Sequence, residues 1–226
     1  MNIEIETIQN EDTQYQNEEI QYQREDIQYQ NEEIQYQSED TQYQNEEIQY
    51  MDNTMKIKLQ MRKLWTDHAI FTRQFIVDLL DNLPSIDYTI DRLIKNQEQT
   101  GNCFRPFFGD VAADNIVFLL KEHITVAAEL FKAILSGNIT DATTLEDQWT
   151  ANVENMSTCL CTINQYYSID ELLDMFKTHL ILTKYQFIAR MDKDYNADIL
   201  YFDMGLNHLL RLSDCLTDGI CEYFFE

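Results

Sequence analysis

The sequence predicts an all-α protein: an antiparallel up-down helical bundle with a short extra helix, preceded by a low-complexity acidic tail. The chain of 226 residues contains only 2 Pro and 5 Gly, too few for the turns of a β-sandwich, barrel or propeller. Beyond residue 52, apolar side chains recur at three- and four-residue steps, as on one face of a helix. Short loops separate these stretches, and short loops place consecutive helices antiparallel.

The tail, residues 1–51, is defined by charge and repetition. It holds 14 acidic residues and one basic residue, Arg24. From residue 10 to 51 it repeats the heptad x-E-(D/E)-(I/T)-Q-Y-Q six times. The single Ile or Thr of each repeat does not build the apolar seam of a coiled coil, and adjacent carboxylates repel one another along a helix. Composition therefore predicts a disordered or transiently helical, solvated tail.

Charge also limits the partners. The formal charge of -24 disfavours binding to nucleic acid phosphates and to anionic membrane surfaces. The acidic repeats are instead expected to act as a multivalent docking strip for a basic protein partner. Alternatively, they form an oligomerising helix once their charge is neutralised. No stretch approaches 18 apolar residues, and the N-terminus lacks the basic and apolar regions of a signal peptide. We expect a cytoplasmic or other intracellular location.

Residues 52–226 are expected to form the bundle, starting with three helices. The first runs from about residue 55 to 83, where Pro84 ends it. Ser85 caps a shorter second helix, after which residues 100–102 and 105–109 are expected to be loops. The third helix covers 110–135, and the Ser-Gly-Asn sequence at 136–138 ends it.

Three further helices complete the predicted bundle. The fourth is expected at 144–163. The fifth begins with a capping box, in which Ser168 and Glu171 satisfy each other's backbone N–H groups, and it ends at Met191. The sixth is expected at 196–216, just before Gly219. About 175 residues suffice for one hydrophobic core.

Histidines are the candidate functional residues. The chain has four, and each lies on the apolar stripe of a different long helix. We expect all four to point inward at one level, two facing each other in each of two helix pairs, 68 with 123 and 179 with 208. A threonine one turn after two of them, Thr72 and Thr183, would orient the second ring nitrogen. The flanks of His68 and His179 match, each with a threonine and then a basic residue, and His123 and His208 each have an acidic residue six positions on; these matches hint at a duplicated helical hairpin. The predicted metal ligands are His68, His123, His179 and His208.

Nitrogen donors from histidine limit which metal or cofactor the bundle could bind. Facing helices pack about 8–10 Å apart, so imidazoles from two to four helices can share one metal ion. No Asp or Glu lies three, four or seven residues from any histidine, which excludes a carboxylate-bridged di-iron centre. An all-nitrogen site for zinc, copper or nickel remains, or two histidines across a haem, non-covalent because Cys-x-x-Cys-His is absent. The alternatives are hydrogen-bonded core histidines and a pH-sensing cluster.

Catalysis is not predicted, because no Ser-His-Asp or Cys-His arrangement stands out. The sequence favours a binding protein: a histidine-lined bundle for a transition metal or small cofactor, or else a structural or interaction protein whose acidic repeats dock a basic partner.

Several short motifs carry a resemblance. Leu64-Trp-Thr-Asp-His68, Pro106-Phe-Phe-Gly109 and Leu119-Leu-Lys-Glu-His123 are the clearest, within a span of roughly residues 60 to 222. There the chain resembles a family of uncharacterised all-helical proteins from spore-forming bacteria. The resemblance implies a helical bundle and supplies no activity. The Asn-, Ile- and Tyr-rich tail is similar to proteins of large DNA viruses, for which a place in the virion would be expected.

Overall fold

A computed structural model confirms the all-α fold. It describes the backbone of residues 2–225, and the side chains of that range except those of 2–20, 22, 23, 25, 26, 34, 38, 40, 47 and 225. Six helices and no strand lie in this range. The chain divides into two compact units, Met1–Asn53 and Thr54–Glu226. No helix of the described range is long and apolar enough to cross a membrane.

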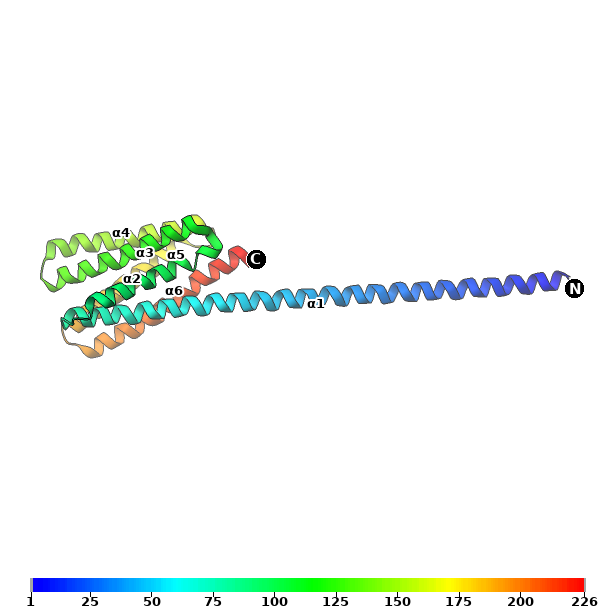
Figure 1. Cartoon of the computed structure of the whole chain (residues 1–226), viewed down its shortest axis with the longest axis horizontal. Helices are drawn as coiled ribbons and strands as arrows, with labels where there is room; N and C mark the ends of the chain where they lie inside the picture. The colour runs from blue at the N-terminus through cyan, green and yellow to red at the C-terminus, as the bar shows by residue number, and fades with distance from the viewer. Residues whose placement is uncertain (1, 226) are drawn as a thin grey trace. The chain divides into compact units, whose positions relative to one another are not determined.

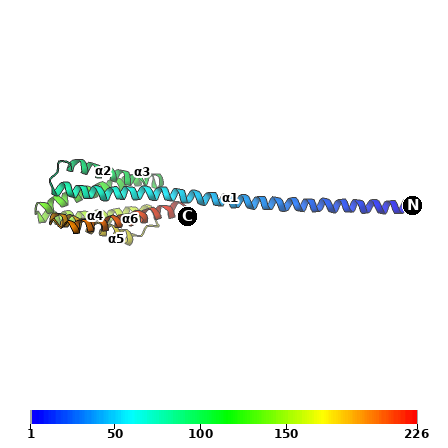
Figure 2. The ribbon, with the colours of Figure 1, turned by 90° about the horizontal axis from the view of Figure 1, so that it is seen from below.

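The second unit is a bundle of six helical segments (Figures 1 and 2). Consecutive segments run antiparallel, and turns after α1, α3 and α5 share one end of the bundle. The helices are α1 (Asn2–Leu80), α2 (Ile86–Asn102), α3 (Arg105–Leu135), α4 (Ile139–Ile163), α5 (Ile169–Met191) and α6 (Tyr195–Phe225).

The first unit consists of the N-terminal part of α1 and contains the heptad repeats. A Gln of one repeat donates a hydrogen bond to a Glu of the next at three places, Gln28–Glu32, Gln35–Glu39 and Gln42–Glu46, with distances of 2.9–3.0 Å. Such i,i+4 pairs support a helix. The side chains of residues 1–20 lie outside the described residues, and the disorder predicted for 1–51 stays a prediction.

Two segments predicted as loops are helical. Residues 100–102 belong to α2, because the missing side chain of Gly101 lets the helix lie directly against Val117 of α3. Residues 105–108 form the first turn of α3, where Pro106 is tolerated because that position needs no intrahelical N–H bond. A kink follows at Gly109, whose φ of 79° favours glycine.

Two other helices are longer than predicted. α4 begins at Ile139, because the side chain of Asn138 accepts a hydrogen bond from the backbone N–H of Asp141 and caps the helix. α6 continues through Gly219 to Phe225. Gly219 does not end the helix; the ring of Tyr167 packs against its Cα, where no side chain interferes. The cap of α5 is as predicted, since Ser168 accepts from the N–H of Glu171.

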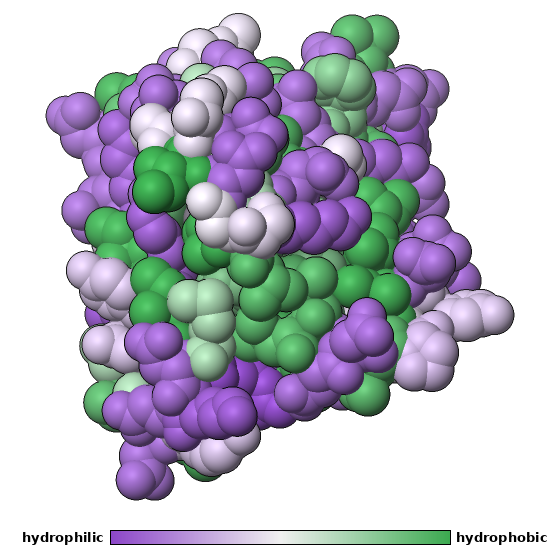
Figure 3. All heavy atoms as spheres, turned by 90° about the vertical axis from the view of Figure 1, so that its left-hand side faces the viewer, coloured by the Kyte–Doolittle hydropathy of each residue, from purple (hydrophilic) through white to green (hydrophobic). Residues whose placement is uncertain are grey.

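The hydrophobic core runs through the centre of the second unit. Phe131 of α3 and Phe187 of α5 stack with ring centroids 4.4 Å apart, and Trp149 of α4 meets Phe131 edge-on at 5.9 Å. All three rings are buried. The end of the bundle that carries the three turns has an apolar hollow surrounded by polar side chains (Figure 3).

Those three turns have the same construction. Each contains one residue with positive φ, namely Asn82, Gly137 and Lys193, and these follow one another at nearly equal intervals along the sequence. In each turn the next backbone N–H bonds to the carbonyl five residues earlier, the longer bond of a Schellman motif. These bonds are Leu83 to Asp78, Asn138 to Ala133 and Asp194 to Ala189, at 2.8–3.0 Å.

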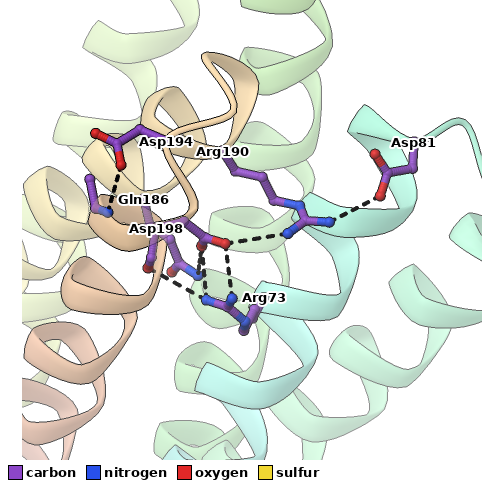
Figure 4. A network of polar contacts seen from close by, with 7 residues as sticks. Arg73, Asp81, Gln186, Arg190, Asp194 and Asp198 are labelled. Carbon is purple, nitrogen blue, oxygen red and sulfur yellow. Dashed lines mark hydrogen bonds and ion pairs between the residues drawn. The ribbon is translucent and has the colours of Figure 1, made fainter.

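A buried ion-pair network lies beside two of these turns (Figure 4). The carboxylate of Asp198 in α6 is fully buried and accepts two hydrogen bonds from Arg73 of α1, at 2.8 and 2.9 Å. Arg190 and Gln186 of α5 also contact it, each at 3.3 Å. Arg190 reaches on to Asp81 at 3.0 Å. The network therefore ties α1, α5 and α6 together.

Candidate histidine site

The bundle consists of three helical hairpins, each with a histidine at the same position. His68, His123 and His179 lie on α1, α3 and α5, with the same near-equal spacing as the three turns. In each hairpin the second helix sends a polar side chain to the carbonyl four residues before that histidine. The three bonds are Asn96 Nδ2 to Leu64 O (3.0 Å), Asn152 Nδ2 to Leu119 O (3.0 Å) and His208 Nε2 to Met175 O (2.7 Å). The sequence hinted at two copies of a hairpin; the structure contains three.

The three histidine rings converge in the core. The Nε2 atoms of His68 and His179 lie 3.4 Å apart, with ring centroids at 5.3 Å. The centroid of His123 lies 5.8 Å from that of His179. Each residue is at most 4% exposed, so three helices deliver imidazoles to one enclosed place.

Hydrogen bonds assign the tautomers of two rings. Asn96 must present its NH2 group to Leu64 O, so its Oδ1 accepts from Gln97 Nε2 at 2.9 Å. The Gln97 amide also donates to Nδ1 of His68 at 3.0 Å, which leaves the His68 proton on Nε2. That N–H donates to Nε2 of His179, whose own proton is on Nδ1, 3.4 Å from Thr183 Oγ1.

The third ring has the opposite arrangement at its Nδ1. Asn152 uses its NH2 group for Leu119 O and for Glu122 at 2.8 Å, so its Oδ1 accepts from Nδ1 of His123 at 3.1 Å. The Nε2 of His123 therefore carries a lone pair.

Burial keeps the cluster neutral. It lowers the pKa of His68 to about 3, assisted by the nearby His123. It lowers the pKa of His123 to about 4, against the opposing effect of the Asn152 hydrogen bond. The pKa of His179 falls well below 6.5 because of burial and then of the neighbouring histidines. At neutral pH all three rings are uncharged, the form that binds metal ions.

A small cavity adjoins the rings. Its volume is about 20 Å³, and its lining includes the three histidines, Thr72 and Trp149. This volume holds about one water molecule or ion. Ligands of cofactor size need roughly 300–1,000 Å³, so a haem does not fit between these helices. Thr72 Oγ1 and Trp149 Nε1 are buried without a hydrogen-bond partner.

The predicted site residues divide into two groups. His68, His123 and His179 come together, whereas His208 is buried close enough to His179 to help lower the pKa of that ring but uses its Nε2 for the backbone carbonyl of Met175. Thr183 contacts its histidine as predicted, at 3.4 Å. Thr72 does not: Gln97 occupies the second nitrogen of His68 because α2 packs across that ring.

Sequence reasoning missed the amides Asn96, Gln97 and Asn152. A signal for two of them was available, since Asn96, Asn152 and His208 follow one another at equal intervals along the sequence. As the side chains stand, no group of three or more His, Cys, Asp or Glu among the described residues is arranged to hold a metal ion. Comparisons with protein-family models, curated proteins and solved structures found no match to this chain.

Proposed function

We propose that the bundle binds one transition-metal ion, zinc, copper or nickel, between His68, His123 and His179. The observation that carries this proposal is the 3.4 Å separation of the Nε2 atoms of His68 and His179. Two nitrogens bound to one tetrahedral ion at 2.0–2.1 Å lie about 3.3–3.4 Å apart. The ion would take the place of the proton that these two rings share.

The hydrogen bonds around the three rings support a metal site at His123 and His179 and require a proton shift at His68. The Nδ1 atoms of His123 and His179 already donate to neighbouring oxygens, the support that ligating imidazoles need. His68 must move its proton from Nε2 to Nδ1 before it can bind. Gln97 would then turn its amide so that the oxygen accepts that proton, at the expense of its bond to Asn96. Metal binding thus requires a local rearrangement of the hydrogen bonds described above.

The test is metal content and affinity of the full-length, untagged protein purified without chelators. We expect about one equivalent of metal by elemental analysis, and loss of that metal in His68→Phe, His123→Phe and His179→Phe. His208→Asn is the matched control. Asn occupies the equivalent place in the other two hairpins, so this variant keeps the donor to Met175 O and should keep the metal.

Two results would contradict the proposal. One is a folded wild-type protein that neither retains metal nor takes up added zinc, copper or nickel. The other is loss of metal in His208→Asn with retention in His123→Phe, which would assign the site to a different set of ligands.

A second proposed function is the docking of a basic partner on the repeats, and the exposed tyrosines of the repeats favour it. Tyr29, Tyr36 and Tyr43 have exposed fractions of 73%, 78% and 72%. A seven-residue spacing keeps them on one side of a helix, with the next tyrosine about 10.5 Å along the axis. Glu32 and Glu33, three and four residues after Tyr29, lie on the same side. An arginine side chain can pair with such a carboxylate and stack on the adjacent ring.

Binding of nona-arginine and nona-lysine peptides to the full-length chain tests this second function. We expect tighter binding of the arginine peptide, weakening steeply between low and high salt. Replacing Tyr29, Tyr36 and Tyr43 by Leu should reduce the preference for arginine, whereas Tyr88→Leu, at an equally exposed tyrosine of the bundle, should not. Unchanged binding to a chain that lacks residues 1–51 would rule it out.

A further inference from the structure

We infer that the cavity beside the histidine cluster binds one water molecule, which bridges Trp149, Thr72 and His123. The inference concerns the metal-free protein and does not rest on the proposed metal binding. Its basis is that three polar groups with unused hydrogen-bonding capacity line one cavity of about 20 Å³. A space of this size holds about one water molecule, and a buried water typically needs two to four polar partners.

Two of the three groups lack a partner within the protein. Trp149 Nε1 is a donor only, belongs to a residue that is 2% exposed, and has no hydrogen-bond acceptor. Thr72 Oγ1 is buried and also lacks a partner. Thr183, which holds the equivalent position after its histidine, instead donates to the carbonyl of His179 at 2.8 Å. Buried polar groups without partners are costly, so a molecule in the cavity that bonds to Trp149 and Thr72 would stabilise the fold.

The third group determines the class of ligand. Nδ1 of His123 donates to Asn152, so Nε2 of the neutral ring can only accept a hydrogen bond. Trp149 Nε1 can only donate, so a molecule that bonds to both must accept at one atom and donate at the other. Water does so, whereas a halide ion can only accept and an apolar gas does neither. The hydroxyl of Thr72 can take either role, so it completes a third bond to the water.

Water-selective Overhauser spectra of the metal-free, full-length, ¹⁵N-labelled protein test the inference. We expect a cross-peak between water and the indole N–H of Trp149, with the sign in the rotating frame that marks direct contact rather than proton exchange. Trp65 is the matched control. Its Nε1 is also buried without a partner, and its ring also contacts a histidine of the cluster, at 5.8 Å, but Trp65 does not line this cavity. The chain has two tryptophans, so Trp65→Phe assigns both signals, and the Trp65 N–H should show no cross-peak.

Thr72→Val and Thr72→Ser provide a second measurement. Valine removes the hydroxyl at similar size, so a bound water loses a partner: the cross-peak at Trp149 should be lost and the urea midpoint of unfolding should fall. Thr72→Ser keeps the hydroxyl and should keep the cross-peak. Without a bound water, Thr72→Val would remove an unpaired buried hydroxyl and raise the midpoint. A raised midpoint, no cross-peak at Trp149 in the wild type, or equal cross-peaks at Trp65 and Trp149 would overturn the inference. None of these results depends on metal content, which tests the proposed function separately.

Discussion

At the scale of single residues, the buried histidines predict how stability depends on pH. An unfolded histidine has a pKa near 6.5, whereas His68 and His123 in the folded protein have values of about 3 and 4. Between these limits the unfolded state binds more protons than the folded state. Their contribution to stability is therefore complete above pH 6.5 and is lost as the pH falls toward 4.

Urea unfolding of the metal-free protein at pH values from 7.5 to 5 measures this dependence. The free energy of unfolding should decrease steadily below pH 6.5. The His68→Phe variant should show a shallower decrease, because one of the titrating groups is gone. An identical slope in wild type and variant would mean that His68 does not titrate differently in the two states.

On the proposed metal-binding function, Gln97→Glu should tighten the binding of the metal. A carboxylate accepts the Nδ1 proton of His68, which frees Nε2 for the metal without any amide rotation. Changes in such supporting groups typically alter metal affinity 10- to 100-fold, and here the direction is an increase. Zinc affinity from competition with a chelator is the measurement. Equal or weaker binding than in wild type would indicate that His68 does not bind through Nε2.

Residue-level prediction from sequence succeeded for the burial of the histidines, and for their hydrogen-bond partners it succeeded at Thr183 but not at Thr72. The apolar flanks of His68, His123 and His179 were enough to place them inside the bundle, where the structure has them. Which atom each ring contacts depends on how helices distant in sequence cross. Gln97 lies 29 residues from His68 in the sequence. Sequence reasoning therefore selected Thr72, which is nearer in the sequence, as the partner of His68.

At the scale of elements, two glycines inside α6 make opposite predictions. A Cβ at Gly219 would overlap the ring of Tyr167, whereas a Cβ at Gly205 would meet nothing within 4 Å. Gly219→Ala should destabilise the protein by about 1–3 kcal/mol, and Gly205→Ala should stabilise it by about 0.5–1 kcal/mol through helix propensity. Thermal unfolding of both variants is the measurement, and a stabilised Gly219→Ala protein would refute the close-packing explanation.

Apolar periodicity was enough to predict that each helix exists, and the errors of prediction lie at the helix ends. Residues 100–102 and Gly219 look like stop signals because glycine usually ends helices. In this bundle Gly101 packs closely against Val117, and Gly219 packs closely against Tyr167. Only the neighbouring helix distinguishes these two uses, and that neighbour is not visible in the local sequence.

At the scale of the whole molecule, the Asp198 network is predicted to be the most sensitive polar contact. Asp198→Asn removes the negative charge between Arg73 and Arg190 and should cost about 3 kcal/mol, because Arg73 loses its charged partner and Arg190 keeps only Asp81. Lys132→Ala, in an exposed ion pair with Glu129, should cost less than about 1 kcal/mol. Chemical denaturation compares the two, and similar losses would refute the distinction.

The recurrence of one hairpin three times has a consequence for assembly. A peptide that contains only α3 and α4 would expose the apolar stripes, and with them His123, that the other two hairpins cover in the intact chain. Such a peptide can rebuild the enclosure by associating with two further copies of itself. The full-length protein can thus be regarded as a trimer of hairpins joined in one chain. Because the hairpins are linked, their association does not depend on protein concentration. Each hairpin can also carry different side chains around the common centre.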